Sequence, residues 1–311
     1  MLNPYFIFVI SLIALIYGSN LVIDQGRLIA VKFQISNLII GVTIIAFGTS
    51  FPELEVGVLS SIKDEGDIAI SNVIGSNIAN IGLVLGIVAT IKPITIIANS
   101  KLYYNLFYLF FSLFLFVYIC FLDHFSRFSG FFLLFVFLFY MYILLKKFTR
   151  ENSFMNKEHG INLHLSHIVK LILGFLFLAI GSEYLINSII GISNRLSFEN
   201  NIAISMSAVA FGTSVPELMT SLIALIKKEE GLAVGNILGS NIINILLIIS
   251  LSSIANPISL NFNLISYHIL ILIILTVSLI VFMLFMKRIN RISGYFFISI
   301  YFIFIYINFL M

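Results

Sequence analysis

The sequence has 311 residues, of which 60% are hydrophobic and 10% are charged, and its formal net charge at pH 7 is +3. Together with a mean hydropathy of +1.11, this composition excludes an ordinary soluble domain, because no compact globule could bury so much apolar surface. The small net charge by itself says little about partners; the expected partner is the lipid bilayer, and no nucleic acid is expected.

Apolar runs long enough to cross a bilayer, about 20 residues each, follow one another along the chain with short polar breaks between them. We expect helices rather than barrel strands, because a helix satisfies its own backbone groups in lipid and the runs are too long for strands. The first run has no basic start and no clear cleavage site, so it is interpreted as a retained span. The expected fold class is an all-α integral membrane protein with ten transmembrane helices, at residues 4–26, 33–62, 67–91, 102–122, 128–147, 163–190, 200–226, 232–254, 261–286 and 292–310.

The basic residues are sorted between the two sides of the membrane when the breaks are counted alternately. One side holds only Lys63, Arg127 and Arg195. By the positive-inside rule the other side is cytoplasmic, which places both termini outside. The cytoplasmic set is Arg27, Lys32, Lys92, Lys101, Lys146, Lys147, Arg150, Lys157, Lys170, Lys227, Lys228, Lys287, Arg288 and Arg291.

A polar motif occurs twice at an offset of 164 residues. AFGTSFPEL at 46–54 returns as AFGTSVPEL at 210–218, and NVIGSNIAN at 72–80 returns as NILGSNIIN at 236–244. Each copy places a carboxylate and several hydroxyls and amides inside an apolar segment, where an ionised group is costly and usually functional.

The repeated motif divides the chain into two halves. With one copy starting on the second helix and the other on the seventh, each half has five helices, and an odd number forces opposite orientations. We expect inverted repeats at 1–148 and 162–311, with motif regions at 41–86 and 205–250, joined by a cytoplasmic linker at 149–161. Inverted repeats with broken helices are typical of secondary transporters, whose substrate binds where the repeats meet.

Two prolines predict where the broken helices lie. Pro52 has no N–H to donate to the carbonyl of Gly48, and Pro216 has the same effect on Gly212, so both helices should kink there. A carbonyl freed at this depth needs another partner, which can be a hydroxyl, a water or a metal ion. The carbonyls expected to face an ion are those of Ala46, Thr49, Ala210 and Thr213.

Glu53 and Glu217 are the central candidate ligands, because two buried carboxylates without an intramembrane Lys or Arg need a counter-charge. Such an oxygen-rich shell suits Ca²⁺ far better than zinc or copper, and the single Cys120 excludes a thiolate cluster within one chain. Polar residues and prolines in membrane helices can also serve packing alone. The further side chains on these helices are Thr49, Ser50, Asn72, Ser76, Asn80, Thr213, Ser214, Asn236, Ser240 and Asn244.

Charge counting predicts obligatory exchange. Two carboxylates neutralise one Ca²⁺ or two Na⁺, and losing either cargo without replacement leaves uncompensated charge in a medium of low dielectric constant. An empty site should therefore resist reorientation across the membrane, whereas a filled one can move.

The two motif copies resemble the alpha repeats of the calcium/cation antiporter superfamily, in particular its Na⁺/Ca²⁺ exchanger branch. The GTS-x-PEL and GN-x-x-GSN-x-x-N forms are nearly intact, with Ser71 standing where the second copy has Gly235. The resemblance implies ten helices, inverted topology, outside termini and sodium-driven calcium extrusion by alternating access, electrogenic with three Na⁺ for each Ca²⁺. It implies no prosthetic group, because Ca²⁺ and Na⁺ are cargo.

Carried over by position, the resemblance also implies a ligand set. The Ca²⁺ ligands are Glu53 and Glu217 with the carbonyls of Thr49 and Thr213. Asn244 stands where many relatives carry Asp, so potassium independence is expected. The sodium sites fall on Ser50, Ser76, Ser214 and Ser240 with the carbonyls of Ala46 and Ala210, and Asn80 and Asn244 flank the centre.

Alternative functions remain open at this point. A Ca²⁺/H⁺ antiporter or another divalent cation exchanger could use the same carboxylates, since a buried carboxyl can carry a proton, although protons would not need the four serines. A channel would more often surround an axis with several subunits, whereas here one chain contains the whole site. This is compatible with function as a monomer, and the sequence identifies no particular protein partner. No Lys lies beside the buried serines to activate a nucleophile, so an enzyme is not expected.

Two further expectations concern location and Glu55. The absence of a transit peptide and of a large cytoplasmic loop fits the plasma (inner) membrane of a prokaryote. Glu55 lies two residues beyond Glu53 and so points to a different face of the helix. It either lines the ion path or pairs locally.

Overall fold

The computed structural model describes residues 3–148, 164–195 and 212–310, and these form helices apart from four strands of two residues each. Within that part of the chain, eight helices are long and apolar enough to cross a membrane, or nine when one bent pair is taken as a single span. The seventh expected span, 200–226, is described only from residue 212 onward, where α11 continues to Ile226.

The elements agree closely with the apolar runs of the sequence. In the first half they are α1 (Pro4–Phe33), α2 (Asn37–Ile40), η1 (Gly41–Ile45), α3 (Ala46–Thr49), α4 (Phe51–Ile62), α5 (Gly66–Ala79), η2 (Asn80–Leu85), α6 (Gly86–Ile91), β1 (Ile94–Thr95), α7 (Ser100–Cys120), β2 (His124–Phe125) and α8 (Arg127–Phe148). In the second half they are α9 (Leu165–Arg195), α11 (Val215–Ile226), α12 (Glu230–Ile243), η3 (Asn244–Ile248), α13 (Ile249–Ala255), β3 (Ile258–Ser259), α14 (Phe262–Val281), η4 (Phe282–Met286), β4 (Arg288–Ile289) and α15 (Arg291–Leu310).

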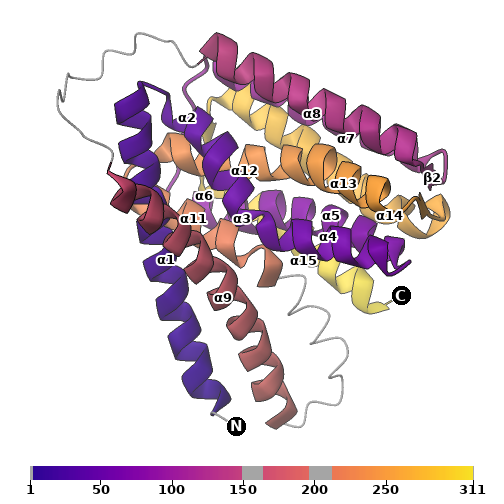
Figure 1. Ribbon diagram of the computed structural model, residues 1–311, viewed down its shortest axis with the longest axis horizontal. Helices are drawn as coiled ribbons and strands as arrows, with labels where there is room; N and C mark the ends of the chain where they lie inside the picture. The colour runs from indigo at the N-terminus through magenta and orange to yellow at the C-terminus, as the bar shows by residue number, and fades with distance from the viewer. Residues whose placement is uncertain (1–2, 149–163, 196–211, 311) are drawn as a thin grey trace.

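The helices form two groups. Helices α1 and α9 run side by side as a pair that leans away from the remaining bundle, whereas α12 and α13 pass through the middle of that bundle (Figure 1). Burial follows this division, because the most apolar part of Glu230–Ala255 is 100% buried and that of Leu165–Ile192 is only 22% buried. The α1–α9 pair therefore presents most of its surface to the lipid.

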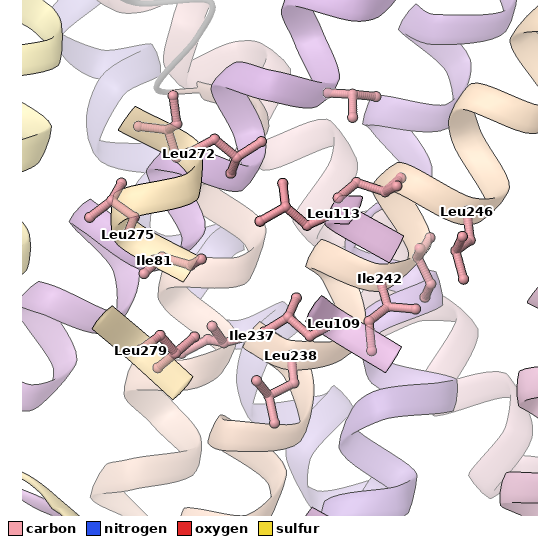
Figure 2. Packing of buried hydrophobic residues seen from close by; sticks show 14 of the residues in the cluster. Ile81, Leu109, Leu113, Ile237, Leu238, Ile242, Leu246, Leu272, Leu275 and Leu279 are labelled. Atoms are coloured by element: carbon pink, nitrogen blue, oxygen red, sulfur yellow. The ribbon is translucent and has the colours of Figure 1, made fainter. Parts of the chain in front are cut away.

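Part of the hydrophobic core lies where α7 packs against both α12 and α14. Figure 2 shows Leu109 and Leu113 of α7, Ile237 of α12 and Leu275 of α14 converging on one another. Each is buried. Because lipid is as apolar as leucine, this packing is stabilised by close contact rather than by removal from water. It holds α12 rigidly at the centre of the bundle.

Glycines allow the second span to cross α12 at very short range. A Cβ on Gly41 would lie 2.6 Å from the carbonyl oxygen of Leu232, and one on Gly239 would lie 2.5 Å from that of Val42. A Cβ on Gly235 would overlap the carbonyl oxygen of Leu38. Small residues at membrane helix crossings permit such backbone contact, and here they bring the two motif-bearing spans together.

The polar breaks pair in a way that agrees with the expected sides of the membrane. Strand β1 pairs with β4 in an antiparallel manner, and β2 pairs likewise with β3. The first pair joins two breaks expected on the cytoplasmic side, and the second joins two expected outside. Two ion pairs also join breaks on the expected cytoplasmic side. Arg27 lies 3.1 Å from Glu229, and Lys227 lies 2.7 Å from Asp24. Arg27 and Lys227 are both among the basic residues expected on that side.

Candidate cation-binding site

Both motif copies interrupt their helix at the same serine. Helix α3 ends at Thr49 and α4 begins at Phe51 with a bend of 49°, which confirms the kink predicted from Pro52. In the second copy Ser214 directly precedes α11, and its φ of −88° and ψ of 2° resemble the −85° and 11° of Ser50. Glu53 and Glu217 thus lie in first turns of helices, where the helix dipole favours negative charge.

The two carboxylates face the same interior region. Glu53 and Glu217 both have 0% exposed surface, and they are close enough to interact electrostatically. Among the described residues no Lys or Arg forms an ion pair with either of them. Two buried negative charges without a basic partner are strongly unfavourable unless a cation or protons balance them.

Glu217 has hydroxyl donors from both halves of the chain. The Ser50 hydroxyl donates to Glu217 Oε1 at 3.1 Å, and the Ser240 hydroxyl donates to the same oxygen at 3.4 Å. Ser50 belongs to the first motif copy and Ser240 to the second. The structure therefore brings these predicted site residues together across the interface between the halves.

Glu53 lacks the corresponding hydrogen bonds. Neither of its carboxylate oxygens has a hydrogen-bond partner among the described residues, and the same holds for the hydroxyl of Ser214. Ser76 lies beside Glu53 and is the hydroxyl available to it. An unpaired buried carboxylate costs several kcal/mol, so this side of the site is the one most in need of a cation.

Amide side chains fix the backbone next to each carboxylate. Asn72 donates to the Glu53 carbonyl at 3.1 Å, and Asn236 donates to the Glu217 carbonyl at 3.4 Å. The Thr49 hydroxyl donates to Asn236 Oδ1 at 3.1 Å. The carbonyl of Ala46 accepts bonds from the Ser50 backbone N–H and the Thr49 hydroxyl, so a cation bound there would share this oxygen with hydrogen-bond donors.

The remaining predicted ligands occupy different places. Ala210 lies outside the described residues. Thr213 is buried and contributes to the wall of a large cavity. Asn80 and Asn244 are fully buried, and a π-helical turn begins at each of them. Both side-chain atoms of Asn80 and the Oδ1 atom of Asn244 lack hydrogen-bond partners among the described residues. Such π turns recur at functional sites in helices.

A cavity of about 1330 Å³ lies between α9, α8 and the second span. Its wall includes Gly48 and Pro52 beside the helix break, while most of the other lining side chains are apolar. Glu55 and Glu183 also line it, and both are exposed. Neither forms an ion pair with a described residue. The face of α4 that Glu55 occupies is therefore that of the cavity, where it adds negative charge beside the helix break.

These groups fit a hard cation. The unpartnered buried atoms of the two motif copies are mainly carboxylate, hydroxyl and amide oxygens, the ligands that Ca²⁺ and Na⁺ prefer. Within 3–148, 164–195 and 212–310, no group of three or more His, Cys, Asp or Glu side chains could hold a metal.

Sequence reasoning missed several residues of this region. Asn77 and Asn241 belong to the repeated GSN element, yet their contacts across the halves could not be foreseen from the motif alone. Ser182 donates to the carbonyl of Gly212, which is the carbonyl that Pro216 leaves without its helix donor. The sequence gives only a weak signal for this bond, because a serine in another helix can be matched to a proline-interrupted helix only when the positions of the two helices are known.

Known proteins resemble this chain over nearly its whole length. The family model for sodium/calcium exchanger proteins matches residues 3–146 and 166–310. An uncharacterised membrane protein of Methanocaldococcus jannaschii is 36% identical over 241 residues, which make up 76% of this chain and 77% of that protein. The sodium/calcium exchanger MaX1 of Methanosarcina acetivorans is 29% identical over 299 residues, with coverage of 82% and 84%.

The fold also has a close counterpart among solved structures. The sodium-calcium exchanger NCX_Mj, soaked with 2.5 mM Na⁺ and 1 mM Sr²⁺, superposes with a TM-score of 0.84 at 32% sequence identity. The match covers 98% of each chain.

Proposed function

The chain belongs to the sodium/calcium exchanger family, and on that premise we propose that it exchanges Na⁺ for Ca²⁺ across a membrane by alternating access. The observation that carries the proposal is that Glu53 and Glu217 are both fully buried and interact electrostatically, while neither oxygen of Glu53 has a hydrogen-bond partner among the described residues. A divalent cation would balance Glu53 and Glu217 together, and two Na⁺ would do the same. Exchange follows because the charge of two unbalanced carboxylates opposes reorientation of the empty protein.

The proposed ligands divide by ion. Ca²⁺ is bound by Glu53 and Glu217 with help from the carbonyls of Thr49 and Thr213. Hydroxyls suit Na⁺ because they supply neutral oxygens, and Asn80 and Asn244 complete the centre. The proposed Na⁺ ligands are Ser50, Ser76, Ser214, Ser240 and the carbonyls of Ala46 and Ala210.

The proposed architecture is ten spans in two inverted repeats, 1–148 and 162–311, with the linker 149–161 on the cytoplasmic side. Matching helix breaks before Glu53 and Glu217 support it, as do π turns that begin at repeat-related asparagines. The strand pairs, each joining breaks of one expected side, agree with the same topology.

Both termini are proposed to lie outside a prokaryotic plasma membrane. Single cysteines at Lys63 and Lys228, both exposed, test this, because the native Cys120 is buried and should react slowly. A membrane-impermeant maleimide added to intact cells should label the Lys63→Cys variant and spare the Lys228→Cys variant. The reverse pattern would overturn the orientation.

Sodium-gradient-driven uptake of calcium-45 into proteoliposomes tests the exchange itself. The unmodified chain should take up Ca²⁺ only when an opposing Na⁺ gradient is present, whereas Glu53→Gln and Glu217→Gln should abolish uptake. The exposed acid Glu65 supplies the matched control, because Glu65→Gln removes a carboxylate outside the site. Uptake driven equally well by a pH gradient would favour proton coupling, and uptake without any counter-ion would favour a channel.

Two finer properties follow from the charge of the site. Three Na⁺ moving against one Ca²⁺ carry net charge, so a valinomycin-set membrane potential should change the initial rate of uptake. With Asn244 in place of a third carboxylate, replacing external K⁺ by choline should leave the rate unchanged. A rate that is insensitive to voltage would contradict electrogenic exchange. A rate that depends strongly on K⁺ would contradict potassium independence.

A further inference from the structure

Asn77 holds the side chain of Asn244 from across the interface between the two halves. Asn244 Nδ2 donates to Asn77 Oδ1 at 3.0 Å, and both side chains have 0% exposed surface. The Asn244 Oδ1 atom then has no hydrogen-bond partner among the described residues. Asn244 thus keeps its donor group toward Asn77 and leaves its acceptor oxygen free.

The orientation of an amide decides whether it attracts or repels a cation. The carbonyl oxygen is a ligand for Ca²⁺ or Na⁺, whereas the NH₂ group carries partial positive charge and only donates. A rotation of the Asn244 amide by half a turn would exchange these groups. Which group remains free is therefore a functional property of the site.

A backbone carbonyl determines that orientation. Asn77 Nδ2 points to the carbonyl oxygen of Asn241 at 3.5 Å, and a backbone carbonyl can only accept. If the Asn244 amide rotated, its oxygen would face Asn77 Oδ1, acceptor against acceptor. If the Asn77 amide rotated as well, its oxygen would face the Asn241 carbonyl instead. Each rotation leaves buried polar atoms opposed or unpaired, which is costly.

We infer that Asn77 is a positioning residue, which orients the amide oxygen of Asn244 as a ligand for the transported cation. The inference rests on the proposed function and deepens it, since it gives a role to an element of the motif that contributes no ligand of its own. The residue at the related position does not act in the same way here. Asn241 Nδ2 donates within its own helix to Ile237 at 2.7 Å, and Asn241 Oδ1 and the Asn80 amide lack partners among the described residues.

Equilibrium binding of Ca²⁺ to the purified full-length protein tests the inference. Asn77→Leu keeps the branched shape of the side chain but removes both hydrogen bonds, and it should raise the Kd for Ca²⁺ by about tenfold. Asn105→Leu in α7 is the control, because Asn105 is an equally buried amide with two hydrogen bonds that lies outside both motif copies, and it should change the Kd by less than about threefold. Asn77→Ala provides a second variant if the larger side chain does not fold.

A second background separates positioning from mere structure. A carboxylate presents an oxygen in either rotation, so Asn244→Asp removes the need for an orienting partner. In the Asn244→Asp background, Asn77→Leu should change the Kd by less than about twofold. An equal loss of affinity in both backgrounds, or no loss in the Asn244 background, would overturn the inference. Absence of Ca²⁺ binding by the unmodified protein would instead reject the proposed function.

Discussion

Glu53 and Glu217 occupy related positions in two nearly identical motifs, yet their surroundings differ. Glu217 accepts hydrogen bonds from Ser50 and Ser240, whereas both oxygens of Glu53 lack partners among the described residues. The asymmetry continues outward, since Asn244 donates to Asn77 whereas the Asn80 side chain lacks a partner among the described residues. A repeated sequence therefore supplies the same groups twice, but the arrangement of the helices gives related groups different hydrogen-bond partners.

The largest expected difference concerns the two carboxylates. Glu53→Gln and Glu217→Gln should each raise the Kd for Ca²⁺ by about 100-fold or more, because each removes half of the counter-charge. Without Na⁺ and Ca²⁺, however, Glu53→Gln should stabilise the protein more than Glu217→Gln does, since it removes the carboxylate that has no donors. Calorimetric binding and thermal unfolding in detergent measure the two effects. Equal unfolding temperatures for the two variants would show that the hydrogen bonds to Glu217 do not make its surroundings more favourable than those of Glu53.

The motif position that differs between the halves gives the next effect. Gly235→Ser, which copies Ser71 into the second half, would drive a Cβ into the carbonyl of Leu38 and should cost about 3 kcal/mol of stability. Ser71 is exposed, so the reciprocal Ser71→Gly should cost only about 1 kcal/mol, the usual helix penalty of glycine. Thermal unfolding of the purified variants provides the measurement, and similar losses in both would show that the crossing at α12 is not unusually close.

Substitutions of the two serines at the helix breaks, Ser50 and Ser214, should differ by a smaller amount in their effect on stability. Ser50→Ala removes a donor from a buried carboxylate and should lower stability in the absence of cations by about 2 kcal/mol. Ser214→Ala removes a hydroxyl without a partner among the described residues, so its effect should stay within about 0.5 kcal/mol. Both substitutions should weaken Na⁺ dependence in flux assays. If Ser214→Ala proved as destabilising as Ser50→Ala, the pairing described for Glu217 would not distinguish the two halves.

The smallest expected effect concerns the cavity. Glu55 has Met219 at the related position of the second half, so the repeated motif contributes an acidic side chain to the cavity from its first copy only, beside Glu183 of α9. Glu55→Gln should raise the apparent KM for Ca²⁺ by about threefold at low ionic strength, because exposed charges concentrate cations near a site. The effect should vanish in high salt, where such charges are screened. Initial uptake rates over a range of Ca²⁺ concentrations, with Glu65→Gln as control, decide the matter, and a change that persists in high salt would point to direct coordination.

Much of the fold could be predicted from local signals. The expected runs 67–91, 232–254 and 261–286 correspond to the spans Gly66–Ile91, Glu230–Ala255 and Phe262–Met286, because lipid demands a continuous apolar helix of fixed length. The break before Glu53 was predictable for a similarly local reason, since Pro52 lacks an N–H. The π turns at Asn80 and Asn244 carried no comparable signal, because a single wide turn depends on how neighbouring helices pack.

The sequence by itself determined the chemistry of this protein: a membrane solvent, two carboxylates in related positions, and hydroxyls and amides spaced to share helix faces with them. Only the tertiary structure decided which of these groups hydrogen-bond to one another: Ser50 donates to Glu217, and Asn77 orients Asn244. It also decided that Glu55 faces a cavity. The physical reason is that helix periodicity fixes which side chains share a face. Contacts between halves depend instead on the distance and angle at which helices cross, and here glycines on α12 and the second span set that distance.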